Sequence, residues 1–214
     1  MASRPIQRLA DAFSKLPGVG PRQALRFVFF LLREERTYAA ELGDAVRKLH
    51  DEVKRCTQCY KTFDVNGPAG SGTAAVAFCE ICRDSRRKQH YVLVVEKEVD
   101  LQNIEGTGRY DGTYHVLGGT VNPLDSSAPS RLHVRELFSR LERRAADGRL
   151  ELILGTSATT EGDTTALYLE RTLSPLKARF EGFTISRLGR GLTTGTELEY
   201  SDEATISSAL ENRK

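Results

Sequence analysis

The sequence predicts a multi-module protein of the α+β or α/β class, in which a mostly parallel sheet follows a helical region and a cysteine-bounded segment. Three observations carry this prediction. Apolar residues recur at helical spacing before residue 54, and four cysteines then come as two close pairs. From Tyr91 onward, continuous apolar runs alternate with helical patterns, which indicates an α/β layer. A chain of 214 residues is long enough for two to three such modules.

The composition is that of a folded protein without a membrane segment. Hydrophobic residues make up 39% and charged residues 28%, which argues against disorder along the whole length. No apolar run approaches the roughly 20 residues of a membrane-spanning helix, and the polar start does not resemble a signal peptide. We therefore expect a cytoplasmic protein. Residues 1–91 hold 16 Lys and Arg against 10 Asp and Glu, a net +6, whereas residues 92–214 hold 15 against 19, a net −4. This asymmetry suggests two surfaces with different partners, although scattered charges could also serve only for solubility.

The first module, residues 1–55, is expected to be helical. One helix runs through Ile6, Leu9 and Phe13 and ends before Pro17, which cannot continue it. A second helix starts at Pro21, and a third covers 42–53 and ends just before the first cysteine. Three phenylalanines of the second helix, Phe27, Phe29 and Phe30, cannot all face one internal core. At least one of them is left for a partner chain or for a wider core.

The turn between the first two helices carries a candidate nucleic-acid site. Gly18 and Gly20 let the backbone come close to a phosphate, and the free N–H groups at the start of the next helix favour an anion. Arg22 and Arg26 lie four residues apart, so they share a face of that helix. The alternative is a helical hairpin whose glycines only make a tight turn. The whole pattern resembles the helix-hairpin-helix module, which grips a nucleic-acid backbone without reading its sequence.

The second module, residues 56–90, contains a candidate metal site. Cys56 and Cys59 form one Cys-x2-Cys pair, and Cys79 and Cys82 form another after 19 residues. This spacing is typical of a zinc finger, in which four thiolates hold one structural zinc ion per chain and leave no open position for catalysis. The alternative, four unrelated buried cysteines, is disfavoured because paired Cys-x2-Cys spacing is rare by chance.

The third module, residues 91–190, is expected to hold the parallel sheet. Buried strands are predicted at 91–95, 150–154 and 184–188, with helices at 131–146 and 164–173 between them. A Gly/Thr/Tyr-rich connection joins the first strand to the first of these helices. A tail, residues 191–214, follows and ends in a short helix at 205–210.

Acidic residues gather where the predicted strands end. Glu96 closes the first strand, and Glu161 and Asp163 lie in the loop after the second. Ligands of open α/β sheets sit beyond the carboxyl ends of the strands, so these three carboxylates are expected to converge. Such a cluster could hold Mg²⁺ or a basic protein partner. Alternatively they are surface acids or helix caps, and Asp163 in particular suits a helix start.

A series of motifs resembles the RecR family of bacterial recombination mediators over nearly the whole chain. Besides the four cysteines, the motifs are Leu-Pro-Gly-Val-Gly-Pro at 16–21, Val-Val-Glu at 94–96, Thr-Gly-Arg-Tyr-Asp-Gly at 107–112, Tyr-His-Val-Leu-Gly-Gly at 114–119, Asn-Pro-Leu-Asp at 122–125, Glu-Gly-Asp-Thr-Thr-Ala at 161–166 and Leu-Glu-Tyr-Ser-Asp-Glu at 198–203. The resemblance implies a helix-hairpin-helix, a zinc finger, a Toprim domain and a C-terminal tail with a Walker B-like motif. It also implies a clamp-like homodimer or homotetramer that binds single- and double-stranded DNA. With RecO and RecF, such an oligomer would load recombinase onto gapped or single-stranded DNA at the nucleoid.

The chain departs from the usual family pattern at three places. Residues 67–77 look like an insertion between the cysteine pairs, Tyr60 stands where a glycine is common, and Ser126 to Ala128 replace common glycines. These departures affect local loops and not the family assignment.

The function expected from the sequence is a non-enzymatic DNA-binding mediator. The rival is a Toprim-type metal-dependent phosphoryl-transfer enzyme, such as a nuclease or a primase. A topoisomerase or a primase would need more chain than 214 residues allow. A zinc-ribbon adaptor that binds only proteins would leave Arg22 and Arg26 in the hairpin unexplained.

Overall fold

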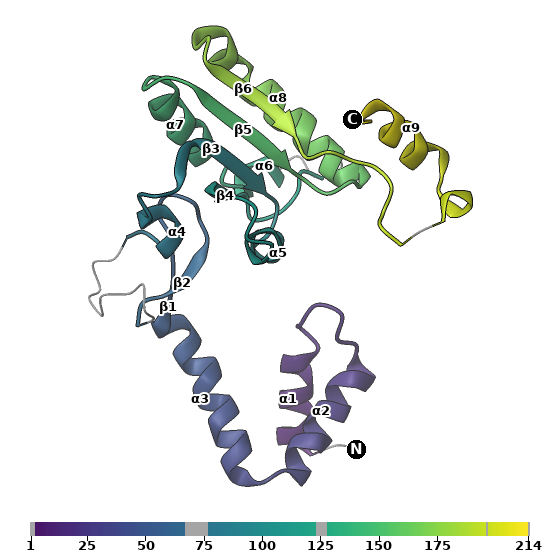
Figure 1. The fold of residues 1–214 in the computed structure, drawn as a ribbon. Helices are drawn as coiled ribbons and strands as arrows, with labels where there is room; N and C mark the ends of the chain where they lie inside the picture. The colour runs from purple at the N-terminus through teal and green to yellow at the C-terminus, as the bar shows by residue number, and fades with distance from the viewer. Residues whose placement is uncertain (1–2, 67–76, 123–127, 196, 214) are drawn as a thin grey trace. The chain divides into compact units, whose positions relative to one another are not determined.

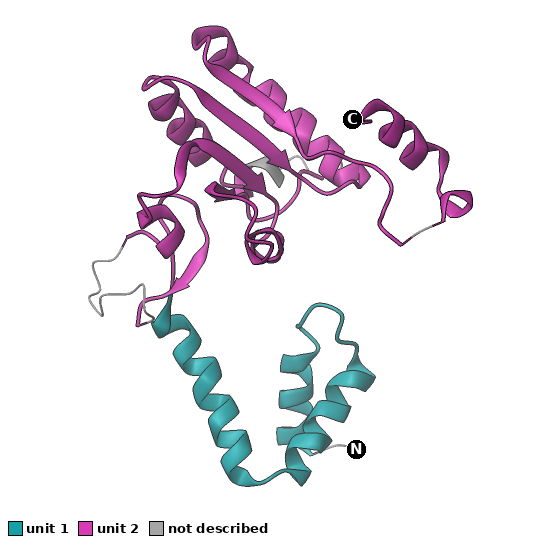
Figure 2. Cartoon of the chain, viewed as in Figure 1, with its two compact units in different colours: residues 1–53 teal, residues 54–214 magenta. Residues whose placement is uncertain are grey.

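A computed structural model describes residues 3–66, 77–122, 128–195 and 197–213. The chain divides into two compact units, residues 1–53 and residues 54–214 (Figures 1 and 2). The expected insertion at 67–77 lies outside the described residues apart from Ala77, as do Ser126 and Ser127.

Unit 1 is helical, as the sequence predicts. Its elements are α1 (Arg4–Phe13), α2 (Pro21–Arg33) and α3 (Arg36–Glu52) (Figure 1). Helices α1 and α2 pack through Ala10, Ala24 and Val28, and small or β-branched side chains there let the two backbones approach closely. Helix α3 has no buried residue. It ends at Glu52, one residue before the predicted end of this helix, because residues 53–55 form a strand.

The cysteine segment opens unit 2. Strands β1 (Val53–Arg55) and β2 (Thr62–Asp64) pair as a two-stranded sheet, and the short helix α4 (Glu80–Arg83) follows. The backbone N–H of Thr57 donates to the carbonyl of Ala77 at 2.9 Å, which ties the first cysteine pair to the second.

A four-stranded sheet forms the centre of unit 2, in the order β4-β3-β5-β6, and every neighbouring pair is parallel. The mostly parallel sheet expected from the sequence is thus confirmed. The elements of this part are β3 (Lys88–Val95), α5 (Glu98–Gly106), β4 (Gly112–Val116), α6 (Ala128–Arg131), α7 (Val134–Ala145), β5 (Leu150–Gly155), α8 (Thr160–Arg179) and β6 (Phe183–Arg187) (Figure 1).

Side-chain alternation along β3 divides the core between the two faces of the sheet. Val92 and Val94 pack with helices α7 and α8 on one face. Leu93 and Val95 pack with α5 and with the cysteine segment on the other face, where Phe63 and the cysteines are buried. The cysteine segment is therefore the cover of one sheet face, and its folding and that of the sheet are coupled through shared apolar contacts.

The stretch between β3 and α6 contains two elements that the sequence did not reveal. Helix α5 and edge strand β4 lie in the stretch predicted only as a Gly/Thr/Tyr-rich connection. All five residues of β4 are buried, polar ones included. Thr113 donates to the carbonyl of Tyr91 at 3.0 Å, and a ring nitrogen of His115 lies 2.8 Å from the carbonyl of His133. Hydrogen bonding thus makes these polar side chains compatible with burial.

Helix α8 is longer than predicted, and it continues through Pro175. Beyond β6, the described tail contains a single 3₁₀ turn (Leu198–Tyr200) and helix α9 (Glu203–Glu211). Among the described residues, no helix combines the length and the apolar character that crossing a bilayer requires.

Candidate functional site

The turn between α1 and α2 presents open backbone. Gly18 has a φ of 77°, a conformation that favours glycine, and the N–H of Val19 closes the turn on the carbonyl of Leu16 at 3.1 Å. A side chain at Gly18 or Gly20 would meet no other atom within 4 Å. The turn therefore leaves space on its outside for a ligand to approach the backbone.

Arg22 and Arg26 lie on the first two turns of α2, directly after this open turn. Both side chains are exposed. Arg26 donates to the side chain of Gln23 at 3.5 Å, and neither arginine has an ion pair within the described part of the chain. Helix α2 begins at Pro21 after Gly20, which caps it with no side-chain hydrogen bond, so the first-turn N–H groups remain available to an anion. The arrangement suits a phosphate backbone, and the role of these four residues remains a prediction.

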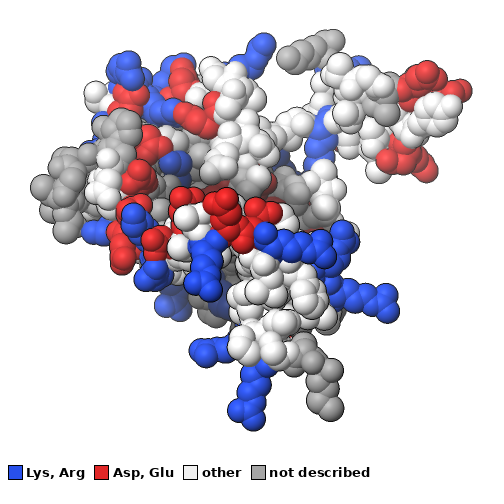
Figure 3. All heavy atoms as spheres, turned by 90° about the horizontal axis from the view of Figure 1, so that it is seen from below, with Lys and Arg blue, Asp and Glu red and all other residues white. Residues whose placement is uncertain are grey.

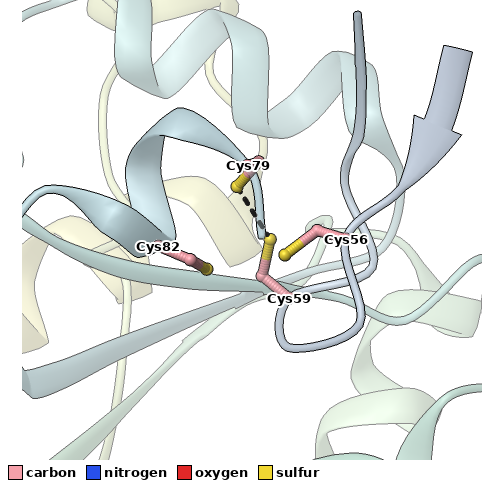
Figure 4. A group of neighbouring side chains, drawn as sticks. All are labelled: Cys56, Cys59, Cys79 and Cys82. Carbon is pink, nitrogen blue, oxygen red and sulfur yellow. Dashed lines mark hydrogen bonds between the residues drawn. The ribbon is translucent and has the colours of Figure 1, made fainter. Parts of the chain in front are cut away.

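The four cysteines converge on one point in unit 2 (Figure 4). Cys56 and Cys59 lie on the turn between β1 and β2, Cys79 caps α4, and Cys82 lies within that helix. One sulfur from each residue lies within 4.8 Å of the others, and the sulfurs of Cys59 and Cys79 are 3.5 Å apart. All four are free thiols, three of them fully buried.

These sulfur positions fit a tetrahedral metal ion. Zinc–sulfur bonds of about 2.3 Å put the sulfurs of a tetrahedral site about 3.8 Å apart, which is close to the spacing observed. Hydrogen bonds from Cys59, Cys79 and Cys82 lower the pKa of Cys56, whereas contacts within the same cluster and burial raise the pKa values of Cys59 and Cys82. A bound cation is therefore needed to hold all four side chains as thiolates. The four sulfurs form a soft and complete donor set, which can hold a metal ion such as zinc and leaves no position for a reacting water.

Tyr60 follows Cys59 with a φ of 66° and is the one non-glycine residue in the described chain with a positive φ. This is one of the three places at which the sequence departs from the pattern that the resemblance implies. The ring of Tyr60 stacks on that of His133 with centroids 3.9 Å apart. The turn that carries Cys56 and Cys59, here called the first cysteine knuckle, thus contains a left-handed residue at a position where a glycine would be less strained. The ring of this residue also forms an aromatic contact with His133.

Glu96 lies at the carboxyl end of β3. Strands β4 and β5, which follow β3 along the chain, lie on opposite sides of it in the sheet, so the strand order reverses at β3. This is the switch point at which open α/β sheets bind ligands. Glu96 is only 4% exposed. Its carboxylate accepts hydrogen bonds from the backbone N–H of Ser157 at 2.9 Å and from its hydroxyl at 3.0 Å. Glu96 therefore positions the loop after β5.

Glu161 and Asp163 lie in the first turn of α8, at the same edge of the sheet, and each has its own partner. The exposed carboxylate of Glu161 accepts from the hydroxyl of Thr120 at 3.2 Å. Asp163 forms ion pairs with Arg187, at 2.7 Å, and with Arg190. These contacts, that with Arg190 first, lower the pKa of Asp163.

The three acids thus share an edge without forming a common ligand set. Within the described ranges, the cysteines are the one group of three or more candidate metal ligands whose donor atoms come close together. The expectation of three converging carboxylates needs correction in this respect, because Asp163 is neutralised by arginines of its own chain and Glu96 is committed to Ser157.

Sequence reasoning missed the arginines that surround these sites. Arg187 is the last residue of β6 and Arg190 lies three residues further on, so the spacing Arg-x-x-Arg in the sequence could have indicated this pair. Arg140 and Arg144 lie one turn apart on α7 next to its buried stripe of Leu137 and Leu141, and Arg140 is itself buried. In the sequence, a basic residue directly beside an apolar helical stripe could have indicated a buried arginine here.

Figure 3 shows that both basic and acidic side chains are exposed in one view of the chain. Arguments about binding therefore rest on individual residues and their partners, not on the net charge of half the chain.

Comparisons with family models cover most of the chain. Residues 6–50 match the helix-hairpin-helix of RecR, residues 90–189 match the Toprim domain, and residues 194–214 match the C-terminal region of RecR. The helix-hairpin-helix and Toprim modules expected from the sequence are thereby confirmed.

Curated relatives match over the full length. The chain is 40% identical to recombination protein RecR of Cutibacterium acnes over 213 residues, which is 100% of this chain and 96% of the relative. It is 40% identical to recombination protein RecR of Chlorobium chlorochromatii, over 97% of this chain and 95% of the relative. It is 39% identical to recombination protein RecR of Myxococcus xanthus, over 100% of this chain and 99% of the relative.

Proposed function

The chain belongs to the RecR family of recombination proteins, and from this premise we propose that it is a DNA-binding mediator of recombinational repair. In this proposal, a clamp-like homo-oligomer binds single- and double-stranded DNA. It acts with RecO and RecF to load recombinase onto gapped or single-stranded DNA, in the cytoplasm at the nucleoid.

The observation that carries the DNA-binding proposal is the pair Arg22 and Arg26 beside the open turn at Gly18 and Gly20. Both guanidinium groups are exposed and have no carboxylate partner within the described ranges. A hairpin used only for packing would not need two unpaired positive charges on the face next to free backbone N–H groups. Such a face contacts phosphates and does not read bases.

The proposed oligomer, a dimer or a tetramer, is supported by apolar surface on unit 1. Phe27 packs against Phe13, with ring centroids 5.8 Å apart, whereas Phe29 and Phe30 are exposed. Helix α3 adds a stripe at helical spacing that unit 1 itself does not bury. The exposed apolar residues of α2 and α3 are Phe29, Phe30, Leu32, Tyr38, Leu42, Val46 and Leu49. A second copy of the chain would remove this surface from water.

The cysteine site is proposed to hold one structural Zn²⁺ per chain. Three of its thiols are fully buried against the sheet core. Without a cation, buried thiolates would be strongly disfavoured, and metal binding therefore contributes directly to folding.

No catalytic activity is proposed. The Toprim match favours one rival, a metal-dependent phosphoryl-transfer enzyme with Mg²⁺ at Glu96, Glu161 and Asp163. The ion pairs of Asp163 with Arg187 and Arg190 support a binding role for this edge instead.

The decisive experiment removes the two hairpin arginines. Affinity for single-stranded, double-stranded and gapped DNA is measured over a salt series for the full chain and for the Arg22→Ala/Arg26→Ala variant. We expect weaker binding to all sequences alike and a duplex salt slope lower by about 2.

A matched control is Arg33→Ala/Arg36→Ala, which removes the same charge from exposed positions of the same unit. Equal losses in the two variants would reduce the effect to net charge. Unchanged affinity and slope in the hairpin variant would remove the hairpin from the function.

A further inference from the structure

A basic cavity of about 580 Å³ lies beside α7 and the first cysteine knuckle. Four arginines line it, Arg135, Arg140, Arg143 and Arg144, together with the aromatic rings of Tyr60 and Phe78. No residue of the hairpin, of the cysteine set or of the acidic edge is part of its lining. Its volume is in the range of small-ligand sites.

The two inner arginines have only neutral hydrogen-bond partners in the described chain. Arg140 is 3% exposed and donates to the carbonyl of Tyr114 at 2.5 Å and to the hydroxyl of Thr113 at 3.0 Å. Its Nε has no partner among the described residues. Arg144 donates to the backbone and side-chain oxygens of Gln89 at 2.9 and 2.7 Å.

The positive charge of Arg140 is partly balanced by the cysteine site. Burial lowers the pKa of Arg140, and the thiolates of Cys82, Cys59 and Cys56 act in the opposite direction. A tetrathiolate zinc carries two negative charges, so the inner guanidinium is explained by the cysteine site. Arg144, by contrast, has a pKa lowered to about 10, first by burial and then by repulsion from Arg140.

The outer arginines are not explained in this way. Arg135 and Arg143 are exposed, and neither has an ion pair with any residue that the structure describes. The single acidic residue of the lining is Glu136. Leaving out Arg140, the three positive charges of Arg135, Arg143 and Arg144 face one negative charge, which makes the cavity a site for an anion.

The aromatic rings indicate which anion fits. Phe78 is 43% exposed although it lies directly before a buried cysteine. An exposed ring beside arginines is the combination that binds single-stranded nucleic acid, where the arginines take phosphates and the ring stacks on an unpaired base. A duplex keeps the faces of its bases hidden, and an acidic peptide would use the arginines without the ring.

We propose that this cavity is a second DNA contact, which holds neighbouring backbone phosphates and an adjoining unpaired base of single-stranded DNA. The inference rests on the proposed DNA-binding function and adds a site that distinguishes single strands from duplex. The hairpin contacts backbone of either kind, whereas the cavity engages only a strand with free bases.

The first test locates the contact. Oligothymidylate carrying 5-bromodeoxyuridine is cross-linked by light to the full-length, zinc-loaded protein, and the modified peptides are identified by mass spectrometry. Cross-links at Phe78 or Tyr60 are expected. Cross-links confined to unit 1 would overturn the inference.

The second test removes the outer charges. Arg135→Ala/Arg143→Ala is expected to lower the salt slope for oligothymidylate by about 1.4, which corresponds to two lost phosphate contacts. Arg149→Ala/Arg171→Ala removes equal charge from exposed positions elsewhere in unit 2 and should leave the slope unchanged. Phe78→Leu is expected to weaken single-strand binding about fivefold or more and to leave duplex affinity unchanged.

The outcomes separate this inference from the proposed function. If the cavity variant binds oligothymidylate as the wild type does while the hairpin variant is impaired, the cavity is not a DNA site. If the wild type binds no DNA, the proposed function itself fails. Oligoglutamate that binds through Arg135 and Arg143 while DNA binding is unaffected would reassign the cavity to an acidic polypeptide. Equal zinc content and melting temperature are required of every variant, and Arg135→Gln/Arg143→Gln replaces the alanine pair if it misfolds.

Discussion

The ring of Tyr60 stacks on the ring of His133 with centroids 3.9 Å apart and an angle of 21° between the planes. Tyr60 belongs to the first cysteine knuckle, whereas His133 immediately precedes α7. The same tyrosine has a left-handed backbone, with a φ of 66°. One residue thus combines an unfavourable backbone conformation with a contact that fixes the knuckle to the α/β part of unit 2.

Replacing Tyr60 separates these two contributions. Tyr60→Gly and Tyr60→Ala both lose the stacked ring, but only alanine keeps the Cβ that makes a positive φ unfavourable. We expect Tyr60→Gly to be more stable than Tyr60→Ala by about 1 kcal/mol. Denaturant unfolding of the two zinc-loaded variants measures this difference. An alanine variant as stable as the glycine variant would show that the turn relaxes without cost.

Loss of one cysteine should lower zinc content and stability together. In Cys79→Ala, three candidate metal ligands remain. The cysteine segment, which packs on one face of the sheet, then loses its metal contact at the start of α4. We expect less than one zinc per chain and a melting temperature lowered by several degrees. Metal analysis and thermal unfolding are the measurements, and a chelator added to the wild type should lower its melting temperature similarly. Full zinc occupancy with unchanged melting would show that Cys79 is not a ligand.

The parts of the fold that the sequence predicted have local signals. Pro17 ends one helical pattern, Pro21 begins the next, and the spacing of the four cysteines is visible without any knowledge of the fold. Continuous apolar runs gave β3 and β5 to within three residues at either end. In each case the information lies within a few neighbouring residues.

The parts that it missed depend on residues far apart in the chain. Strand β4 contains Thr113 and His115, which look like surface residues until Tyr91 and His133 supply their hydrogen bonds. The same holds for the acidic edge. Their positions after predicted strands identified Glu96 and Asp163 as candidate site residues. The sequence did not predict that Ser157 would donate to the carboxylate of Glu96 or that Arg190 would form an ion pair with Asp163.

The ion pairs of Asp163 predict a specific pH dependence. Its pKa is lowered by Arg190 and Arg187, so folding stabilises the charged carboxylate. This contribution is present above the unfolded-state pKa of about 3.9 and is lost as the pH falls through the lower folded-state value. Because the side chain is 42% exposed, we expect a contribution of only about 0.5 kcal/mol.

Unfolding free energies of the wild type and Asp163→Asn, measured at pH 6 and near pH 3, test this dependence. The difference between the two proteins should shrink at the lower pH. Asp147→Asn, at an exposed position of unit 2, serves as the control. A difference that is constant with pH would show that the ion pairs do not stabilise the charged carboxylate.

The acidic edge divides into a buried and an exposed part, and the two parts should behave differently when they are mutated. Glu96 is buried and its removal leaves the N–H and hydroxyl of Ser157 without their acceptor. Glu96→Ala should therefore lower the free energy of unfolding by about 1–3 kcal/mol. Glu161 is exposed, with a single hydrogen bond from Thr120. Its charge is the one that this edge can present to a basic partner.

We expect Glu161→Ala to weaken the complex with RecO about three- to tenfold at low ionic strength, with a smaller effect at high salt, because a charge pair at the rim of an interface is screened. Affinity for DNA and stability should not change. Glu170→Ala, nine residues further along α8, is the control, and an equal loss there would show that the effect comes from net charge alone. The binding role also predicts no magnesium-dependent nicking, cleavage or primer synthesis. Reproducible turnover that is abolished by Glu161→Ala and retained in Glu170→Ala would establish the phosphoryl-transfer enzyme instead.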